Sequence, residues 1–233
     1  MVNAVVFLIE ALVPRQFPSG YLGLSWEGLC HGYVWQLLTF QFLHAGPLHL
    51  LLNSLGLFSF GFAVEQFLGV KRFLWLYLLS GVLGGLLQVL GQALLPGIMG
   101  IGMVVGASAG LFGLIAAFAL MFPEHDLTVY ILFVFPVTVS AKVLASVFLG
   151  ISILGIVLEA TGIGRSSVAH GAHAGGMFGG AEVPSGRFNA GEKMTLALCS
   201  KAEIRSTTGT VIFDEKGRRR TGAKTQRGSV FTG

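Results

Sequence analysis

The stretch VVGASAGLFGLIAAF, from Val104 to Phe118, decides how this chain folds. It is almost wholly apolar and contains one hydroxyl group, that of Ser108, among glycines and alanines. It belongs to a run from Phe73 to Pro123 that contains no Asp, Glu, Lys or Arg. A membrane helix needs about 20 apolar residues, so this run is too long for one span. It predicts two spans, divided at Pro96-Gly97.

The composition of the whole chain also predicts a membrane protein. Its 233 residues are 53% hydrophobic and 11% charged, with a mean hydropathy of +0.76. Soluble domains carry about 25% charged residues. The 34 glycines indicate membrane helices that pack closely against one another. The two cysteines, Cys30 and Cys199, are too few for a disulfide framework.

The charge distribution divides the chain into two predicted domains. Residues 1–181 carry five Lys/Arg and six Asp/Glu, a net charge of −1, whereas residues 182–233 carry ten and five, a net charge of +5. We expect residues 1–181 to form a membrane domain. We expect residues 182–233, which are rich in Ser, Thr and Gly, to form a flexible, basic cytoplasmic tail. Nucleic-acid binding by this tail is a remote alternative, and we expect no nucleic-acid partner.

The apolar segments predict an all-α fold, a polytopic bundle of six transmembrane helices. The expected ranges are Met1–Val13, Leu48–Val64, Phe73–Leu95, Ala107–Phe122, Ala141–Leu158 and Val168–Ala181. The first helix has no basic leader or small-residue cleavage site, so we interpret it as a span and not a signal peptide. The sixth helix is expected to break after Ala181. Its length would be about 21 Å, against about 30 Å of hydrocarbon.

The positive-inside rule predicts a cytoplasmic N-terminus. This orientation keeps most basic residues inside, namely Lys71, Arg72, Lys142 and the tail. Ser108 then lies at the outer end of the fourth helix, and the segment 14–47 forms an outer loop. Cys30 and Cys199 fall on opposite sides of the membrane, so we expect no disulfide between them.

Polar side chains inside membrane spans are costly and usually functional. Five attract attention in the predicted spans: His49, Asn53, Ser108, His170 and His173. His49 and Asn53 are four residues apart and therefore share one helix face. Taken alone, Ser108 is better explained as a structural residue, whose hydroxyl bonds back to a carbonyl one turn earlier or which marks an interface of small residues. A lone His or Asn is explained equally well by a hydrogen bond between helices. The presence of all five on three helices, all toward the outer side, favours a functional site.

These residue types suit nucleophilic catalysis. A serine needs an adjacent base, and a neutral imidazole serves as one. The N-terminus of a helix supplies N–H groups for a developing oxyanion, and His49 and Asn53 would add side-chain donors. Glycines on both helices, such as Gly176, would allow Ser108 and His173 to approach each other. No acidic residue lies mid-span, so the sequence predicts a Ser-His dyad and not a triad.

Three motifs in this order resemble the rhomboid family of intramembrane serine proteases. They are HAGPLHLLLNSLGLFSFG (His44–Gly61), GASAGLFG (Gly106–Gly113) and AHAGGMFGG (Ala172–Gly180). The resemblance covers residues 1–181. It implies that Ser108 is the nucleophile and His173 the general base. It also implies that His49 and Asn53 are oxyanion-hole side chains, together with the backbone N–H of Ser108.

The resemblance carries further implications. Phe112 matches an aromatic residue that packs against the catalytic histidine. Trp35 matches a position in the first outer loop, where Gln36 follows it in place of the family's frequent arginine. The family cleaves transmembrane-type substrates at small residues near the outer membrane face, without a metal or cofactor. We therefore predict a serine-type endopeptidase, a multi-pass protein of the bacterial inner (plasma) membrane, whose partners are a transmembrane protein substrate and the lipid bilayer.

Two other functions stay open at this point. The first is a catalytically inactive rhomboid-like protein that binds transmembrane segments, because the sixth helix is broken. The second is a small transporter or channel, although the intramembrane carboxylates and repeats expected of one are missing from the sequence. A zinc protease is disfavoured because no His-Glu-x-x-His motif occurs, and His170 and His173 would lack partner ligands.

Overall fold

The computed structural model describes residues 2–14, 17–96, 102–131, 134–163 and 168–187, together with 212–213 and 219–220. The chain divides into two compact units, Met1–Phe188 and Asn189–Gly233. Within the second unit, strands β3 (Ile212–Phe213) and β4 (Arg219–Arg220) pair in antiparallel fashion. Most of the predicted flexible tail lies outside the described residues.

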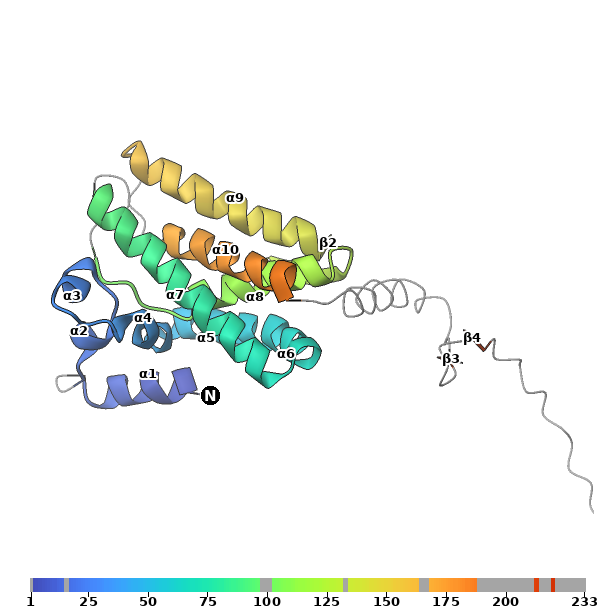
Figure 1. The fold of residues 1–233 in the computed structure, drawn as a ribbon, viewed down its shortest axis with the longest axis horizontal. Helices are drawn as coiled ribbons and strands as arrows, with labels where there is room; N and C mark the ends of the chain where they lie inside the picture. The colour runs from blue at the N-terminus through green and yellow to red at the C-terminus, as the bar shows by residue number, and fades with distance from the viewer. Residues whose placement is uncertain are drawn as a thin grey trace, which may run out of the picture. The chain divides into compact units, whose positions relative to one another are not determined.

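The first unit consists mainly of helices (Figure 1). In chain order they are α1 (Val2–Leu12), α2 (Ser19–Leu22), α3 (Trp26–Cys30), α4 (Gln36–Thr39), the 3-10 turn η1 (Phe40–Phe42), α5 (Pro47–Gly56), the π-helical turn η2 (Leu57–Gly61), α6 (Phe62–Leu68), α7 (Val70–Leu94), α8 (Ser108–Met121), α9 (Ala141–Ala160) and α10 (His170–Arg187). Among the described residues, three helical stretches are long and apolar enough to cross a membrane: Pro47–Leu68, α7 and α9. Helices α1 and α8 are shorter apolar helices.

The prediction for the sixth helix was wrong in its length. Helix α10 does not break after Ala181 but continues to Arg187, giving 18 residues. This corresponds to about 27 Å at 1.5 Å per residue. The helix passes Pro184 and ends three residues later, whereas a proline inside a helix generally kinks or ends it.

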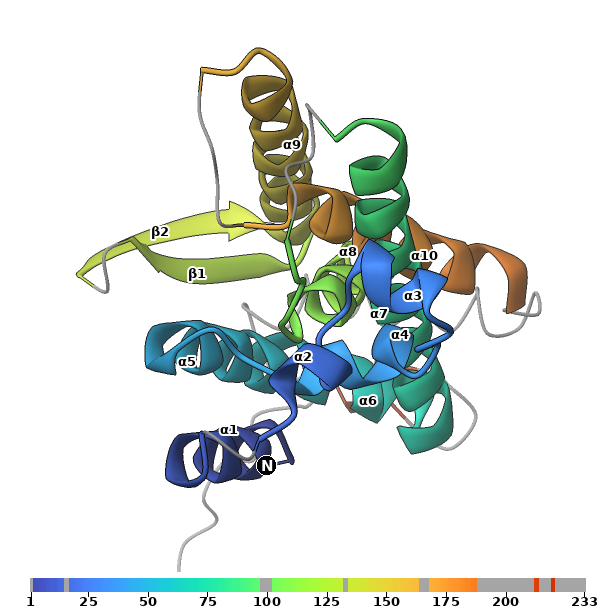
Figure 2. The same ribbon diagram turned by 90° about the vertical axis from the view of Figure 1, so that its left-hand side faces the viewer.

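The all-α prediction missed the β3–β4 strand pair and, in the first unit, a longer β-hairpin. Strand β1 (Asp126–Ile131) pairs with strand β2 (Phe135–Ser140) in antiparallel register, between α8 and α9. Figure 2 shows the hairpin extending sideways from the end of α9. The β-branched residues of this segment favour an extended strand, because their side chains pack well on a pleated surface.

Helices α7, α8 and α10 form the centre of the first unit, and α9 packs on α10 (Figure 1). Helix α8 is buried along most of its length. Segment 19–42, which contains α2, α3 and α4, packs over the end of this bundle at which α8 and α10 begin. There, Leu24 and Phe40 share one apolar core cluster with Ala109 and Ala172. Segment 19–42 therefore covers the region around Ser108.

Candidate active site

The segment before α8 brings Ser108 to the start of its helix. Val104 pairs with Leu24 in an isolated β-bridge, and the N–H of Gly106 donates a hydrogen bond to the carbonyl of Phe40. Gly106 has φ +129°, a conformation that L side chains rarely adopt. Helix α8 then begins at Ser108 itself. The first N–H groups of a helix have no intrahelical acceptor, so donors gather around this hydroxyl.

Glycines allow α8 and α10 to approach closely. A Cβ atom added to Gly176 would lie 2.0 Å from the carbonyl oxygen of Ala109, and one added to Gly180 would lie 2.0 Å from that of Gly113. Such a separation is far shorter than any real contact of a Cβ atom. The two backbones therefore meet with no room for a side chain between them.

This packing brings Ser108 and His173 together. The Oγ of Ser108 lies 2.9 Å from the Nε2 of His173, although 65 residues separate them in the chain. Both residues are half-buried. If the proton of the neutral imidazole is on Nδ1, the hydroxyl donates to the free Nε2. This is the arrangement that a serine nucleophile and its base require.

An aromatic ring holds the imidazole of His173. The rings of Phe112 and His173 stack with centroids 4.0 Å apart and planes 15° apart. Phe112 also contacts Phe148 of α9, with centroids 5.5 Å apart. Phe112 lies one helical turn after Ser108, so α8 carries both the hydroxyl and the ring that orients His173.

His49 and Asn53 both lie on α5, and their contacts differ. An added Cβ on Gly106 would lie 2.8 Å from the Nε2 of His49, so this imidazole packs beside the residue two before Ser108. The N–H of Ala45 donates to the Nδ1 of His49, at 3.4 Å, which leaves the proton of the neutral ring on Nε2. The side chain of Asn53 is buried and donates to the carbonyl of His49, at 3.1 Å.

His44 supports this arrangement from the loop before α5. Its ring is buried and meets the ring of His49 edge-on, with centroids 5.2 Å apart. Burial, and then the neighbouring His49, lower the pKa of His44 from 6.5 to about 4. His44 is therefore neutral at physiological pH, and it adds no positive charge beside His49.

The remaining histidine of the predicted set, His170, begins α10. Its ring lies 6.3 Å from that of His173, and it packs on Gly155 of α9, where an added Cβ would lie 2.4 Å from the ring. Within the ranges that the structure describes, no three His, Cys, Asp or Glu side chains gather in a way that could hold a metal ion.

The sequence interpretation overlooked Gln88 of α7. The Oε1 of Gln88 accepts a hydrogen bond from the backbone N–H of Ala172, at 3.2 Å, and the amide side chain is buried. This N–H belongs to the first turn of α10, where it has no acceptor within the helix. Gln88 therefore holds the backbone next to His173. A polar amide in the middle of an apolar span was the signal for this role.

The sequence analysis noted Gln36 only as a replacement for the family's frequent arginine and did not predict a structural role for it. Its side chain is fully buried. Its Nε2 donates to the carbonyls of Gly20 and Tyr21, both at 3.3 Å, and its Oε1 accepts from the N–H of Ser25, at 3.2 Å. A neutral amide thus holds segment 19–42 together by three hydrogen bonds, and the neighbouring Trp35 donates a fourth to the carbonyl of Tyr21.

Comparison with known proteins identifies the family. The family model of the Rhomboid domain matches residues 31–185, more than half of the chain. The chain is 38% identical over 94 residues to the putative rhomboid protease YdcA of Bacillus subtilis (strain 168), covering 40% of this chain and 44% of that protein. It is 30% identical over 121 residues to Rhomboid-like protease 3 of Toxoplasma gondii, covering 49% and 43%.

A third relative is described as inactive. The chain is 38% identical over 96 residues to Inactive RHOMBOID-like protein 8 of Arabidopsis thaliana, covering 41% of this chain and 25% of that protein. The chain therefore spans less than half the length of each of these three relatives. Since the domain match extends from residue 31 into α10 and spans more than half of the sequence, this multi-pass integral membrane protein belongs to the rhomboid family.

Proposed function

We propose that this protein is an intramembrane serine endopeptidase that cleaves transmembrane-type protein substrates near the outer membrane face. The observation that carries the proposal is the 2.9 Å separation of the Ser108 Oγ and the His173 Nε2. The domain is proposed to be a bundle of six transmembrane helices in a bacterial plasma membrane. Its basic tail, residues 182–233, is proposed to be cytoplasmic.

The proposed reaction follows from these groups. The Ser108 hydroxyl gives its proton to the Nε2 of His173 as its Oγ attacks the scissile carbonyl. The backbone N–H of Ser108 and the Nε2–H of His49 stabilise the oxyanion, and Asn53 contributes its amide. His173 then passes the proton to the leaving amine, and water hydrolyses the acyl-enzyme by the same route. Stacking on Phe112 replaces the orienting carboxylate of a triad.

A fluorophosphonate probe tests the proposal directly, because it reacts only with an activated serine. The purified wild-type protein should be labelled, and Ser108→Ala and His173→Ala should each abolish labelling. Ser146→Ala is the matched control, since this serine is exposed on α9 and donates only to the carbonyl of Lys142. Labelling of Ser108→Ala at the wild-type rate would refute Ser108 as the nucleophile.

The second candidate function is a catalytically inactive protein that binds transmembrane segments. The similarity to Inactive RHOMBOID-like protein 8 favours it, because the identity equals that to the putative protease of Bacillus subtilis. A folded wild-type protein that takes up no probe, yet captures a transmembrane peptide, would support this candidate against the protease.

A further inference from the structure

The β1–β2 hairpin has one apolar and one polar face. The register pairs Leu127 with Val139 and Val129 with Val137, and it places Thr128 opposite Thr138. Side chains of successive strand residues point to opposite faces, so the Leu and Val pairs lie on one face and the Thr pair lies on the other. We call the first face the apolar hairpin face, made of Leu127, Val129, Val137 and Val139. The two threonine hydroxyls lie 3.4 Å apart on the other face, and both residues are exposed.

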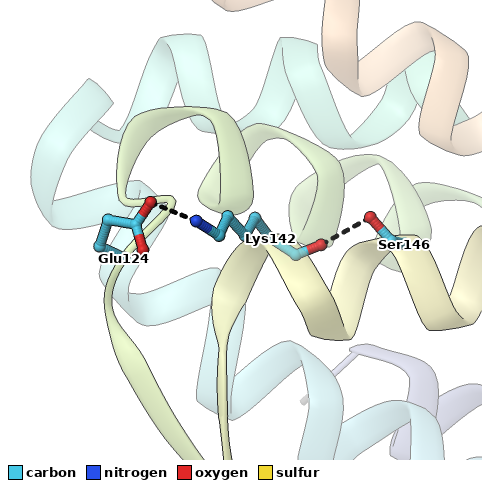
Figure 3. Close-up of polar contacts among 3 residues, drawn as sticks. All are labelled: Glu124, Lys142 and Ser146. Carbon is cyan, nitrogen blue, oxygen red and sulfur yellow. Dashed lines mark hydrogen bonds and ion pairs between the residues drawn. The ribbon is translucent and has the colours of Figure 1, made fainter.

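Polar contacts fix the base of the hairpin to the ends of two helices. The N–H of Ala141 donates to the carbonyl of His125, and the N–H of Lys142 donates to the carbonyl of Pro123. Figure 3 shows the ion pair between Lys142 and Glu124 and the hydrogen bond from Ser146 to the carbonyl of Lys142. These contacts join the end of α8 to the start of α9, so the root of the hairpin is fixed between these two helix ends.

The root of the hairpin lies at the opposite end of α8 from Ser108. Helix α8 has 14 residues, which gives about 21 Å along its axis. Helix α9 is one of the candidate membrane spans, and it begins at the residue that follows β2. The strands therefore leave the bundle at the level where a membrane helix begins, and Figure 2 shows them extending sideways from it.

Apolar side chains are exposed both on the apolar hairpin face and at the start of α9, a candidate membrane span, while Leu127, Val129 and Val139 are half-buried. Val137 is 39% exposed, and Val143 and Val147 of α9 are 44% and 50% exposed. An isolated two-stranded hairpin is marginally stable in water, so its apolar face needs cover. The hairpin cannot cross the hydrocarbon, because its open edges carry unpaired backbone groups and its strands are too short. At the boundary between headgroups and acyl chains, lipid would cover the apolar face while the open strand edges stay outside the hydrocarbon.

Charge does not draw this hairpin to a membrane. Its root and strands carry two acidic residues, Glu124 and Asp126, against the single base Lys142, which is paired with Glu124. Attraction to anionic headgroups therefore has no source here. Association with lipid must come from burial of apolar side chains and must occur with zwitterionic lipid.

We propose that the apolar hairpin face lies in the headgroup and acyl boundary of the bilayer, at the membrane face opposite to Ser108. This gives the hairpin a role as a membrane-surface anchor at the junction of α8 and α9. The polar face, with its threonine pair, lies toward water.

Site-directed fluorescence in phosphatidylcholine nanodiscs tests this proposal. Val137→Cys and Thr138→Cys, in a background with Cys30→Ser and Cys199→Ser, are labelled with a polarity-sensitive dye. These neighbours lie on opposite faces of β2 and form a matched pair. We expect blue-shifted emission at position 137 and quenching by lipids spin-labelled near the headgroup, severalfold stronger than at position 138. The contrast should be equal at low and high salt.

Three results would overturn the proposal. Equal quenching at the two positions would show that the hairpin has no preferred face toward lipid. Water-like emission at both would show that the face is uncovered. Blue-shifted emission without lipid quenching at position 137 would show that a protein surface covers it. Val129→Cys and Thr128→Cys repeat the comparison on β1, and matched melting temperatures show that the variants are folded.

Discussion

Replacing Gly176 by alanine tests whether the approach of α10 to α8 positions the proposed dyad. Gly176 lies one turn after His173, and Ala109 directly follows Ser108. The added Cβ would lie 2.0 Å from the backbone oxygen of Ala109, whereas real Cβ contacts essentially never fall below 3.0 Å. The helices must therefore separate by at least 3.0 − 2.0 = 1.0 Å, because backbone cannot rotate away as a side chain can.

The separation acts directly on the distance between Ser108 and His173. The Oγ to Nε2 distance of 2.9 Å would grow when the helices part. A full transfer of the shift gives roughly 3.9 Å, which is beyond hydrogen-bond distance. A misplacement of about 1 Å can lower a rate about 100-fold. We expect Gly176→Ala to slow fluorophosphonate labelling by about this factor.

The assay compares labelling rates with a matched alanine substitution. Gly150→Ala places its Cβ where no atom lies within 4 Å, on the open side of α9, and should label at the wild-type rate. In Gly180→Ala the added Cβ would also lie 2.0 Å from a backbone oxygen, that of Gly113, but two helical turns from His173. Thermal unfolding of this variant measures the stability lost through disturbed helix packing alone. A folded Gly176→Ala protein that labels as fast as the wild type would refute the reasoning.

Three further predictions concern the groups around the proposed dyad. Phe112→Ala removes the ring stacked on His173, a contact worth about 0.5–1.5 kcal/mol, so labelling should slow by up to about 10-fold; an unchanged rate would contradict this. Gln88→Leu leaves the buried N–H of Ala172 without this acceptor, and thermal unfolding should show a loss of about 1–3 kcal/mol. Burial lowers the pKa of His44 from 6.5 to about 4, so between these pH values the unfolded chain binds a proton that the folded chain does not. The melting temperature should fall as the pH falls from 6.5 toward 4, and His44→Asn should flatten that dependence.

Much of the architecture can be predicted from the sequence, because it depends on properties of residues that are close together in the chain. The absence of charge from Phe73 to Pro123 indicates two membrane helices, and α7 and α8 occupy this run. The three motifs indicate the family, which the match over residues 31–185 shows. These inferences need only composition, helix length and the order of short motifs, all of which are properties of neighbouring residues.

Local patterns did not reveal the ends of the elements or the hairpin. The loss of apolar residues after Ala181 predicted that the sixth helix breaks there, yet α10 continues to Arg187. The segment between α8 and α9 has strand-forming residues, but only the pairing of β1 with β2 satisfies their backbone groups. Propensity is a weak guide to structure, because contacts between distant segments override it.

The sequence by itself determined the membrane character, the family and the residues from which a site can be built. Tertiary structure decided which of those residues meet. It places the Ser108 hydroxyl 2.9 Å from His173 across 65 residues of chain, and it seats the first turn of α10 on Gln88. The physical reason is that helix contacts depend on the absence of side chains at a few facing positions, such as Gly176. A one-dimensional pattern records the small residues but not the surfaces that they face.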